Sequence, residues 1–250
     1  MRKFVIGFVI AFALTLAGCA VAEPPINIDA PIAPPPQIPT TTPLVAPPTT
    51  PPAPPQTPEP DPEPIFTMEA LPEHIIEKIT GSSFHDSTPF PHAHLTYLTI
   101  TYMDFYGESR LGNMIVAAEI GEEVLEIFRE IYESGFPIAG MRLIDYYDAS
   151  DYLSMAANNS VAFNFRYIAG TTTLSRHAFG MAIDINPIQN PFIRGDTILP
   201  EAGRAYINRE DIRPGMIVPG DAVYNAFTER GWTWGGHWSV PQDFHHFERR

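Results

Sequence analysis

The sequence predicts an α+β domain, in which a small, mainly antiparallel sheet is flanked by helices. Helical and strand-like stretches alternate without the regular strand–helix–strand order of a parallel sheet. No glycine-rich phosphate loop is present. All eight histidines follow residue 64, whereas the preceding residues have a composition that cannot form a core. We therefore expect one folded domain over residues 65–250.

The N-terminus has the pattern of an exported protein. Arg2 and Lys3 precede an apolar run, Phe4 to Leu14, which suits a signal peptide and is too short for a comfortable membrane span. The run leads into Leu-Ala-Gly-Cys at residues 16–19, which resembles the bacterial lipobox. We expect residues 1–18 to be cleaved and Cys19 to be lipidated. The lipid would tether the protein to the outer face of the cell membrane, facing the cell wall or periplasm.

Residues 19–64 are predicted to form a spacer. Between residues 24 and 64, 18 of 41 residues are proline, and glycine and aromatic residues are absent, which favours an extended polyproline II segment. The domain that follows carries 13 Lys and Arg against 24 Asp and Glu, a net charge of −11. This charge disfavours nucleic acid or an anionic membrane surface as a partner. Because Cys19 is the only cysteine, any metal must be bound by His, Asp or Glu.

Hydrophobic periodicity predicts the elements of the domain. Residues 121–134 form an amphipathic helix that ends at Gly135, residues 150–157 a short helix capped by Ser150, and residues 221–230 a helix that ends at Gly231. Residues 139–144, 161–168 and 181–185 read as short strands.

Two motifs carry the chemistry. The first runs from Ser175 through His177 and Gly180 to Asp184, and the second is Asp-Phe-His-His-Phe-Glu at residues 243–248. Two imidazoles and a carboxylate can occupy three corners of a zinc tetrahedron and leave the fourth for water. In a strand over residues 181–185, the period of two places the small residues Gly180 and Ala182 on the face of Asp184, which leaves room beside its carboxylate.

The same periodicity decides between the two adjacent histidines. Strand geometry from Phe244 onward places His246 and Glu248 on one face, and His245 and Phe247 on the other. We therefore expect His246, and not His245, to be the metal ligand.

Together the motifs resemble the VanY-type zinc D-alanyl-D-alanine carboxypeptidases, in the metallopeptidase group that also contains lysostaphin-like and hedgehog-like domains. The signature is Ser-x-His-x-x-Gly-x-Ala-x-Asp, followed downstream by an acidic residue, two positions and His, and every fixed position is matched. The run Trp-Thr-Trp-Gly-Gly-His-Trp at residues 232–238 resembles a subfamily that also contains peptidoglycan endopeptidases. The resemblance implies a hedgehog-like or peptidase-like α+β fold.

The resemblance also implies a site. It assigns one zinc ion to His177, Asp184 and His246, and the catalytic acidic role to Asp243. A carboxylate there suits a base that takes a proton from water and returns it to the leaving amine. Manganese or cobalt could also occupy such a donor set.

A peptidase transition state needs a cation or hydrogen-bond donors facing the developing oxyanion. Arg166 is the first choice, since it lies on the segment that leads into the metal loop, and Arg142 competes with it. For both, a structural ion pair in an acidic domain is the alternative. Ser175 is expected to hydrogen-bond near the metal or substrate, or only to shape the turn.

We expect a membrane-tethered zinc carboxypeptidase that removes the terminal D-alanine from peptidoglycan stem peptides. Two alternatives stay open: an endopeptidase that cuts the L-Ala-D-Glu bond, and a catalytically silent wall-binding module that keeps its zinc. The expected partner is the stem peptide, with membrane contact through the N-terminal lipid only and no nucleic acid.

Overall fold

The computed structural model describes residues 63–250. The predicted signal peptide, the predicted lipidation site Cys19 and most of the proline-rich spacer lie outside the described residues. Within residues 63–250, no helix is long and apolar enough to cross a membrane.

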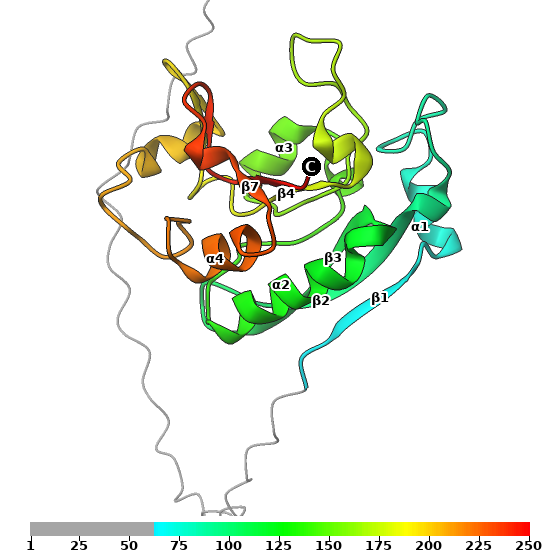
Figure 1. Cartoon of the computed structure of the whole chain (residues 1–250), viewed down its shortest axis with the longest axis horizontal. Helices are drawn as coiled ribbons and strands as arrows, with labels where there is room; N and C mark the ends of the chain where they lie inside the picture. Colours follow the sequence, from blue (N-terminus) through cyan, green and yellow to red (C-terminus); the bar gives the residue numbers. More distant parts are fainter. Residues whose placement is uncertain (1–62) are drawn as a thin grey trace, which may run out of the picture. The chain divides into compact units, whose positions relative to one another are not determined.

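The largest sheet is antiparallel and has the order β1-β2-β3 (Figure 1). Its strands are β1 (Phe66–Ala70), β2 (Leu95–Met103) and β3 (Ser109–Ala117), and the helix α1 (Glu73–Ile79) lies between β1 and β2 in the chain. Asp104 closes the β2–β3 turn, because its carboxylate accepts the backbone N–H groups of Tyr106 and Glu108. Leu98 and Ile100 point from β2 into the core, as the period of two requires.

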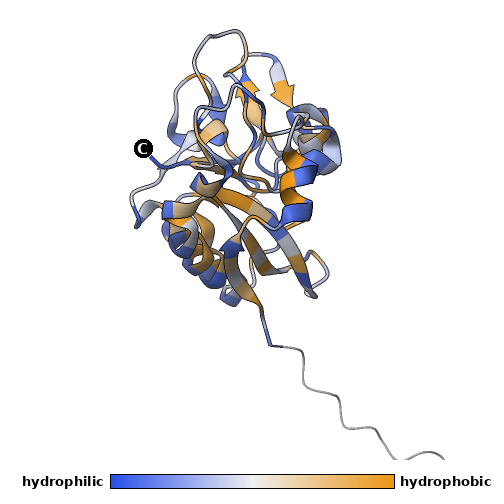
Figure 2. Cartoon of the chain, turned by 90° about the vertical axis from the view of Figure 1, so that its right-hand side faces the viewer, coloured by the Kyte–Doolittle hydropathy of each residue, from blue (hydrophilic) through white to orange (hydrophobic). Residues whose placement is uncertain are grey.

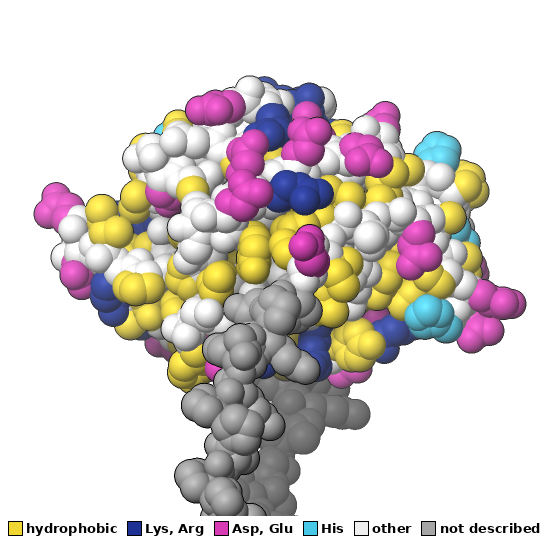
Figure 3. Space-filling view, turned by 90° about the horizontal axis from the view of Figure 1, so that it is seen from below, with side chains coloured by type: hydrophobic (Ala, Val, Ile, Leu, Met, Phe, Trp, Pro, Cys, Tyr) yellow, Lys and Arg dark blue, Asp and Glu magenta, His cyan; other side chains and the backbone are white. Residues whose placement is uncertain are grey.

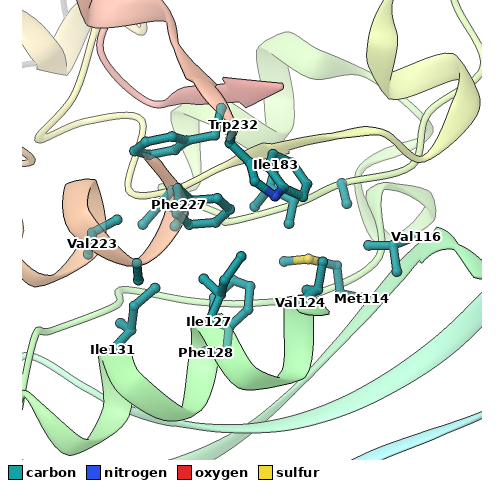
Figure 4. Close-up of a cluster of buried hydrophobic side chains, with 14 of the residues drawn as sticks. Met114, Val116, Val124, Ile127, Phe128, Ile131, Ile183, Val223, Phe227 and Trp232 are labelled. Atoms are coloured by element: carbon teal, nitrogen blue, oxygen red, sulfur yellow. The ribbon is translucent and has the colours of Figure 1, made fainter. Parts of the chain in front are cut away.

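Helix α2 (Gly121–Glu133) covers this sheet (Figure 1). Its apolar side chains recur at helical spacing and are almost fully buried, as Figure 4 shows for Val124, Ile127, Phe128 and Ile131. Each such side chain contributes about 1.5–3 kcal/mol through burial. In Figure 2 the strands inside the molecule are largely apolar, whereas the helices also carry hydrophilic residues.

Two smaller antiparallel sheets form the rest of the domain. The first has the order β4-β9-β7 and contains β4 (Ala182–Asp184), β9 (His246–Glu248) and β7 (Thr233–Trp234). The second has the order β6-β5-β8 and contains β6 (Thr197–Leu199), β5 (Phe192–Arg194) and β8 (Gln242–Asp243). Helix α4 (Ala222–Thr228) contacts both α2 and β7, and Phe227 stacks on Phe247 of β9 inside the shared core.

The α+β prediction is confirmed, and so are three predicted helices and one predicted strand. These are α2, α3 (Asp151–Ala156), α4 and β4. Gly135 and Gly231 follow the ends of α2 and α4 with φ of +72° and +80°. Ser150 caps α3 by accepting the N–H of Leu153.

The strands predicted over residues 139–144 and 161–168 are wrong. Residues 161–168 are extended, but their backbone N–H groups go to separate segments: that of Val161 to Asp184, that of Phe163 to Ile115, and that of Phe165 to Ser83. No single neighbour runs beside the segment long enough to form a ladder. Residues 139–144 make only the isolated bridge of Met141 with Ser160.

Charged side chains are scattered over the face seen in Figure 3, where acidic groups lie between basic ones and apolar patches. Many cations are locally neutralised; for example, the guanidinium of Arg230 pairs with Glu130 of α2. The acidic excess is therefore spread over the surface and does not form one charged face there.

Candidate metal centre

His177 is held by a single turn of 3-10 helix, Arg176–Phe179. Ser175 caps this turn, because its hydroxyl accepts the backbone N–H of His177. Gly180 ends the turn with φ of +65°, a conformation that favours glycine. The Gly180 carbonyl then accepts the N–H of Ala117 in β3, which ties the turn to the large sheet. Ser175 thus has the turn-shaping role that the sequence left open.

Asp184 and His246 come from neighbouring antiparallel strands. In the register of β4 and β9 they are directly opposite each other. Directly opposed residues have side chains close together on the same face of the sheet. On the other edge of β4, Asp184 exchanges two backbone hydrogen bonds with Val161. The Asp184 backbone is therefore fixed from both sides.

The three side chains converge on one point. Nε2 of His177 lies 3.2 Å from Oδ1 of Asp184 and 3.1 Å from Nδ1 of His246, and this last nitrogen lies 3.0 Å from the Asp184 oxygen. All three residues are buried. For zinc bonds of about 2.0–2.1 Å, two corners of a tetrahedron are about 3.3 Å apart. The triangle has nearly the size that a zinc ion requires.

The outer partners of the imidazoles show why a cation fits. Nδ1 of His177 faces the carbonyl oxygen of Ala162, and Nε2 of His246 faces a carboxylate oxygen of Glu248 at 3.5 Å. Each of these nitrogens therefore carries the ring proton, and the opposite nitrogen presents a lone pair. When both rings are neutral, two lone pairs and a carboxylate oxygen meet at about 3 Å, and a metal ion or a proton on His246 must bridge them, so the residues fit a metal ion.

Without a metal, His246 holds its proton tightly and Asp184 gives up its proton readily. Burial lowers the pKa of His246, but the hydrogen bonds to Asp184 and Glu248 outweigh it and raise the pKa to about 10. Burial likewise opposes ionisation of Asp184, yet the neighbouring His177 and His245 hold the pKa of its carboxyl well below the usual range. The pocket is therefore strongly favourable for positive charge.

Asp243 lies at the end of β8, separated from β9 by two residues, and its side chain is about one-seventh exposed. Phe244 and His245 form a turn between the two strands. This turn breaks the alternation that the sequence analysis carried through from Phe244. The expectation that His245 points away from the site is therefore wrong: its Nε2 lies 2.9 Å from Oδ1 of Asp243 and 3.8 Å from Oδ2 of Asp184.

The two arginines lie elsewhere. Arg166 pairs with Asp151 of α3, and Arg142 lies over the ring of Tyr146. Among the described residues, neither makes an ion pair or hydrogen bond with the three ligands. Their contact with substrate stays a prediction. Sequence reasoning missed Trp238 as a neighbour of the site, where its ring lies 5.4 Å from that of His246.

Residues 169–249 match the family model of D-alanyl-D-alanine carboxypeptidase. No curated protein and no solved structure matches the chain. The matched segment contains the three ligands and Asp243, whereas Arg142 and Arg166 precede it. The family is zinc-dependent, in agreement with the donor set that the fold brings together.

Proposed function

We propose that the protein is an exported zinc peptidase that hydrolyses peptidoglycan stem peptides and removes their terminal D-alanine. The observation that carries the proposal is the convergence of two imidazole nitrogens and one carboxylate oxygen on one point, with a second carboxylate, that of Asp243, close by: Nε2 of His245 lies 2.9 Å from Asp243 and 3.8 Å from Asp184. The family match over the same residues supports the choice of substrate.

In this proposal His177, Asp184 and His246 hold the ion and leave one side for substrate. Zinc held there supplies Lewis acidity to the scissile carbonyl and to a water molecule. Asp243 accepts a proton from that water, whose oxygen forms the new bond to the carbonyl carbon. As the peptide C–N bond breaks, Asp243 returns the proton to the leaving amine. The products are a shortened stem peptide and free D-alanine.

Arg166 is the better placed of the two arginines for substrate contact. It lines a surface pocket of about 550 Å³ together with Asn164, Ser82 and His85. The backbone N–H of Asn164 donates to the carbonyl oxygen of His177, so the pocket borders the segment that holds a metal ligand. A cation in that position could bind a peptide carboxylate.

We also propose that Cys19 anchors the protein by a lipid to the outer face of the cell membrane and that residues 19–64 act as a spacer toward the wall. The support is the sequence pattern alone: a basic start, a short apolar run and a cysteine that closes it. A tether of this kind places the peptidase next to peptidoglycan.

The test is mass spectrometry of stem peptides and intact muropeptides after incubation with the zinc-loaded protein, beside an Asp243→Asn variant. We expect wild type to release free D-alanine. Asp243→Asn should retain zinc and turn over about 100-fold more slowly, because the amide cannot accept the proton.

Each other outcome has a distinct meaning. An internal cut at the L-Ala-D-Glu bond would replace the carboxypeptidase with an endopeptidase. No cleavage by a protein that binds zinc would leave a silent wall-binding module. Turnover near that of wild type in Asp243→Asn would remove Asp243 as the base.

A further inference from the structure

His245 lies beside the metal centre without being one of the three ligands. Its side chain is only about 4% exposed. One ring nitrogen, Nδ1, lies 2.7 Å from the carbonyl oxygen of Asn190, and the other, Nε2, lies 2.9 Å from Oδ1 of Asp243. The ring thus spans the distance between a backbone carbonyl and the carboxylate to which we assign the base.

Both neighbours can only accept hydrogen bonds. A carbonyl oxygen has no proton to give, and a carboxylate accepts, so a hydrogen bond at either end of the ring is donated by a nitrogen of His245. The ring is thereby fixed in orientation at two ends. A histidine that served as a metal ligand would instead need a free lone pair directed at the ion.

Asn190 gives the ring a rigid support. It is fully buried, and its side chain donates to the carbonyl oxygen of Gly215 and accepts the N–H of Ile217. Its backbone N–H donates to the carbonyl oxygen of Asn186. A residue bound on so many sides cannot shift, and so it fixes the far end of the His245 ring.

Asp243, at the other end of the His245 ring, is held by far fewer contacts than Asn190. Its Oδ1 atom is buried and has no hydrogen-bond partner among the described residues; its one ion-pair contact there is with Nε2 of His245, at 2.9 Å. A buried carboxylate oxygen without a donor costs free energy and leaves the side chain free to rotate. His245 is therefore the group that decides where the Asp243 carboxylate points.

We propose that His245 is a positioning residue, which ties the Asp243 carboxylate to the rigid Asn190 carbonyl and so aims the base at the reacting water. This role rests on the proposed peptidase function. It goes beyond the ligand set and the base themselves, because it assigns a task to a residue that the sequence pattern had turned away from the site.

The kinetic test compares zinc-loaded wild type, His245→Leu and His245→Gln on a stem peptide that the wild type cleaves. We expect His245→Leu to lower kcat about 10–100-fold, with KM and zinc affinity unchanged, because outer partners of a catalytic group have effects of this size. His245→Gln retains an N–H donor and should recover part of kcat. His74→Gln, an exposed histidine on α1, is the control and should leave kcat unchanged.

Coupling to Asp243 gives a second kinetic readout. In an Asp243→Asn background, His245→Leu should cause no further loss of kcat, since the two residues act as one unit. Independent, multiplicative losses would overturn the proposal. So would a loss of zinc in step with activity, which would make His245 part of the metal site, or an unchanged kcat in His245→Leu.

A spectroscopic test needs no substrate. Nitrogen-15 NMR of the zinc-loaded protein should show a slowly exchanging N–H proton on Nε2 of His245, and Asp243→Ala should remove this signal. Absence of that signal in wild type would overturn the role of His245, even if His245→Leu does not fold. A wild type that shows the signal but cleaves no peptide would remove the proposed function instead.

Discussion

The two histidine ligands are oriented by the hydrogen-bond acceptors on the side of each ring that faces away from the metal site. The Ala162 carbonyl and the Glu248 carboxylate fix which nitrogen of His177 and of His246 carries a proton. Both lone pairs therefore point to the same place as the Asp184 oxygen. A site of this kind is selective for a cation before any ion arrives.

This arrangement predicts that zinc binding releases a proton. With the pKa of metal-free His246 raised to about 10, the residue is protonated at pH 7, and the ion must displace that proton to reach Nδ1. Zinc affinity should therefore rise with pH, about tenfold per pH unit while one proton is released, and fall as the solution is acidified. Calorimetric titrations in two buffers of different ionisation enthalpy measure the release. A binding enthalpy that does not depend on the buffer would contradict it.

At the residue scale, the order and spacing of the motifs predicted which three side chains would meet. They did not predict the position of His245, because a period-two argument assumes an unbroken strand. The turn at residues 244–245 has no Gly, Pro or Asn to mark it. The nearest available signal was Pro241, since residues near a proline at a strand start are prone to irregular backbone.

At the scale of elements, the 3-10 turn that carries His177 depends on Gly180. A Cβ atom there would lie 2.5 Å from the backbone nitrogen of Ala117 and 2.8 Å from the carbonyl carbon of Val116. Both atoms belong to β3, so neither can rotate away. The turn and the large sheet fit together only because this residue has no side chain.

Gly180→Ala should therefore destabilise the protein by more than Gly135→Ala, its matched control. Both glycines have positive φ, but nothing lies within 4 Å of a Cβ at Gly135. The control should cost about 1–2 kcal/mol for the left-handed conformation alone, and Gly180→Ala should exceed it and weaken zinc binding as well. Urea unfolding of the two variants measures the difference. Equal losses would show that the contact with β3 is unimportant.

Helix prediction succeeded where amphipathic periodicity and end signals agreed, as in α2 with its buried stripe and terminal Gly135. The strand prediction for residues 161–168 failed because the local signal does not determine the hydrogen-bond partners. Their apolar, β-prone composition is real, and they are largely buried, but their hydrogen bonds go to several partners. Which backbone groups pair is a tertiary property that local composition cannot encode.

At the scale of the whole molecule, our proposal divides the chain into an anchor, a spacer and a peptidase domain. We expect Cys19→Ser to move the protein from the membrane fraction to the soluble fraction, because the hydroxyl is not the thiol that is acylated. Specific peptidase activity should be unchanged, since the residues that form and support the metal centre all lie within residues 63–250, far from Cys19 in the chain. Fractionation with metabolic fatty-acid labelling measures both effects. A Cys19→Ser protein that stays on membranes would contradict the lipid anchor.

The α+β class followed from the sequence, but the three-stranded sheet under α2 did not. Strands β2 and β3 carry polar residues at several positions, so their pattern is less regular than that of α2. The division into three separate sheets depends on pairings between segments far apart in the chain, such as β4 with β9. Such pairings need the whole core to be in place.

The direct opposition of Asp184 and His246 on adjacent strands also separates the placing of the metal ligands from the rest of the chain between them. The two strands fix these ligands by their own ladder, and the residues between them form β5 to β8 and α4 on the rest of the domain. Parts of that intervening stretch that face solvent can gain or lose residues while the paired strands stay in register. Changes in the length of those loops should therefore leave the spacing of the Asp184 and His246 ligands unchanged.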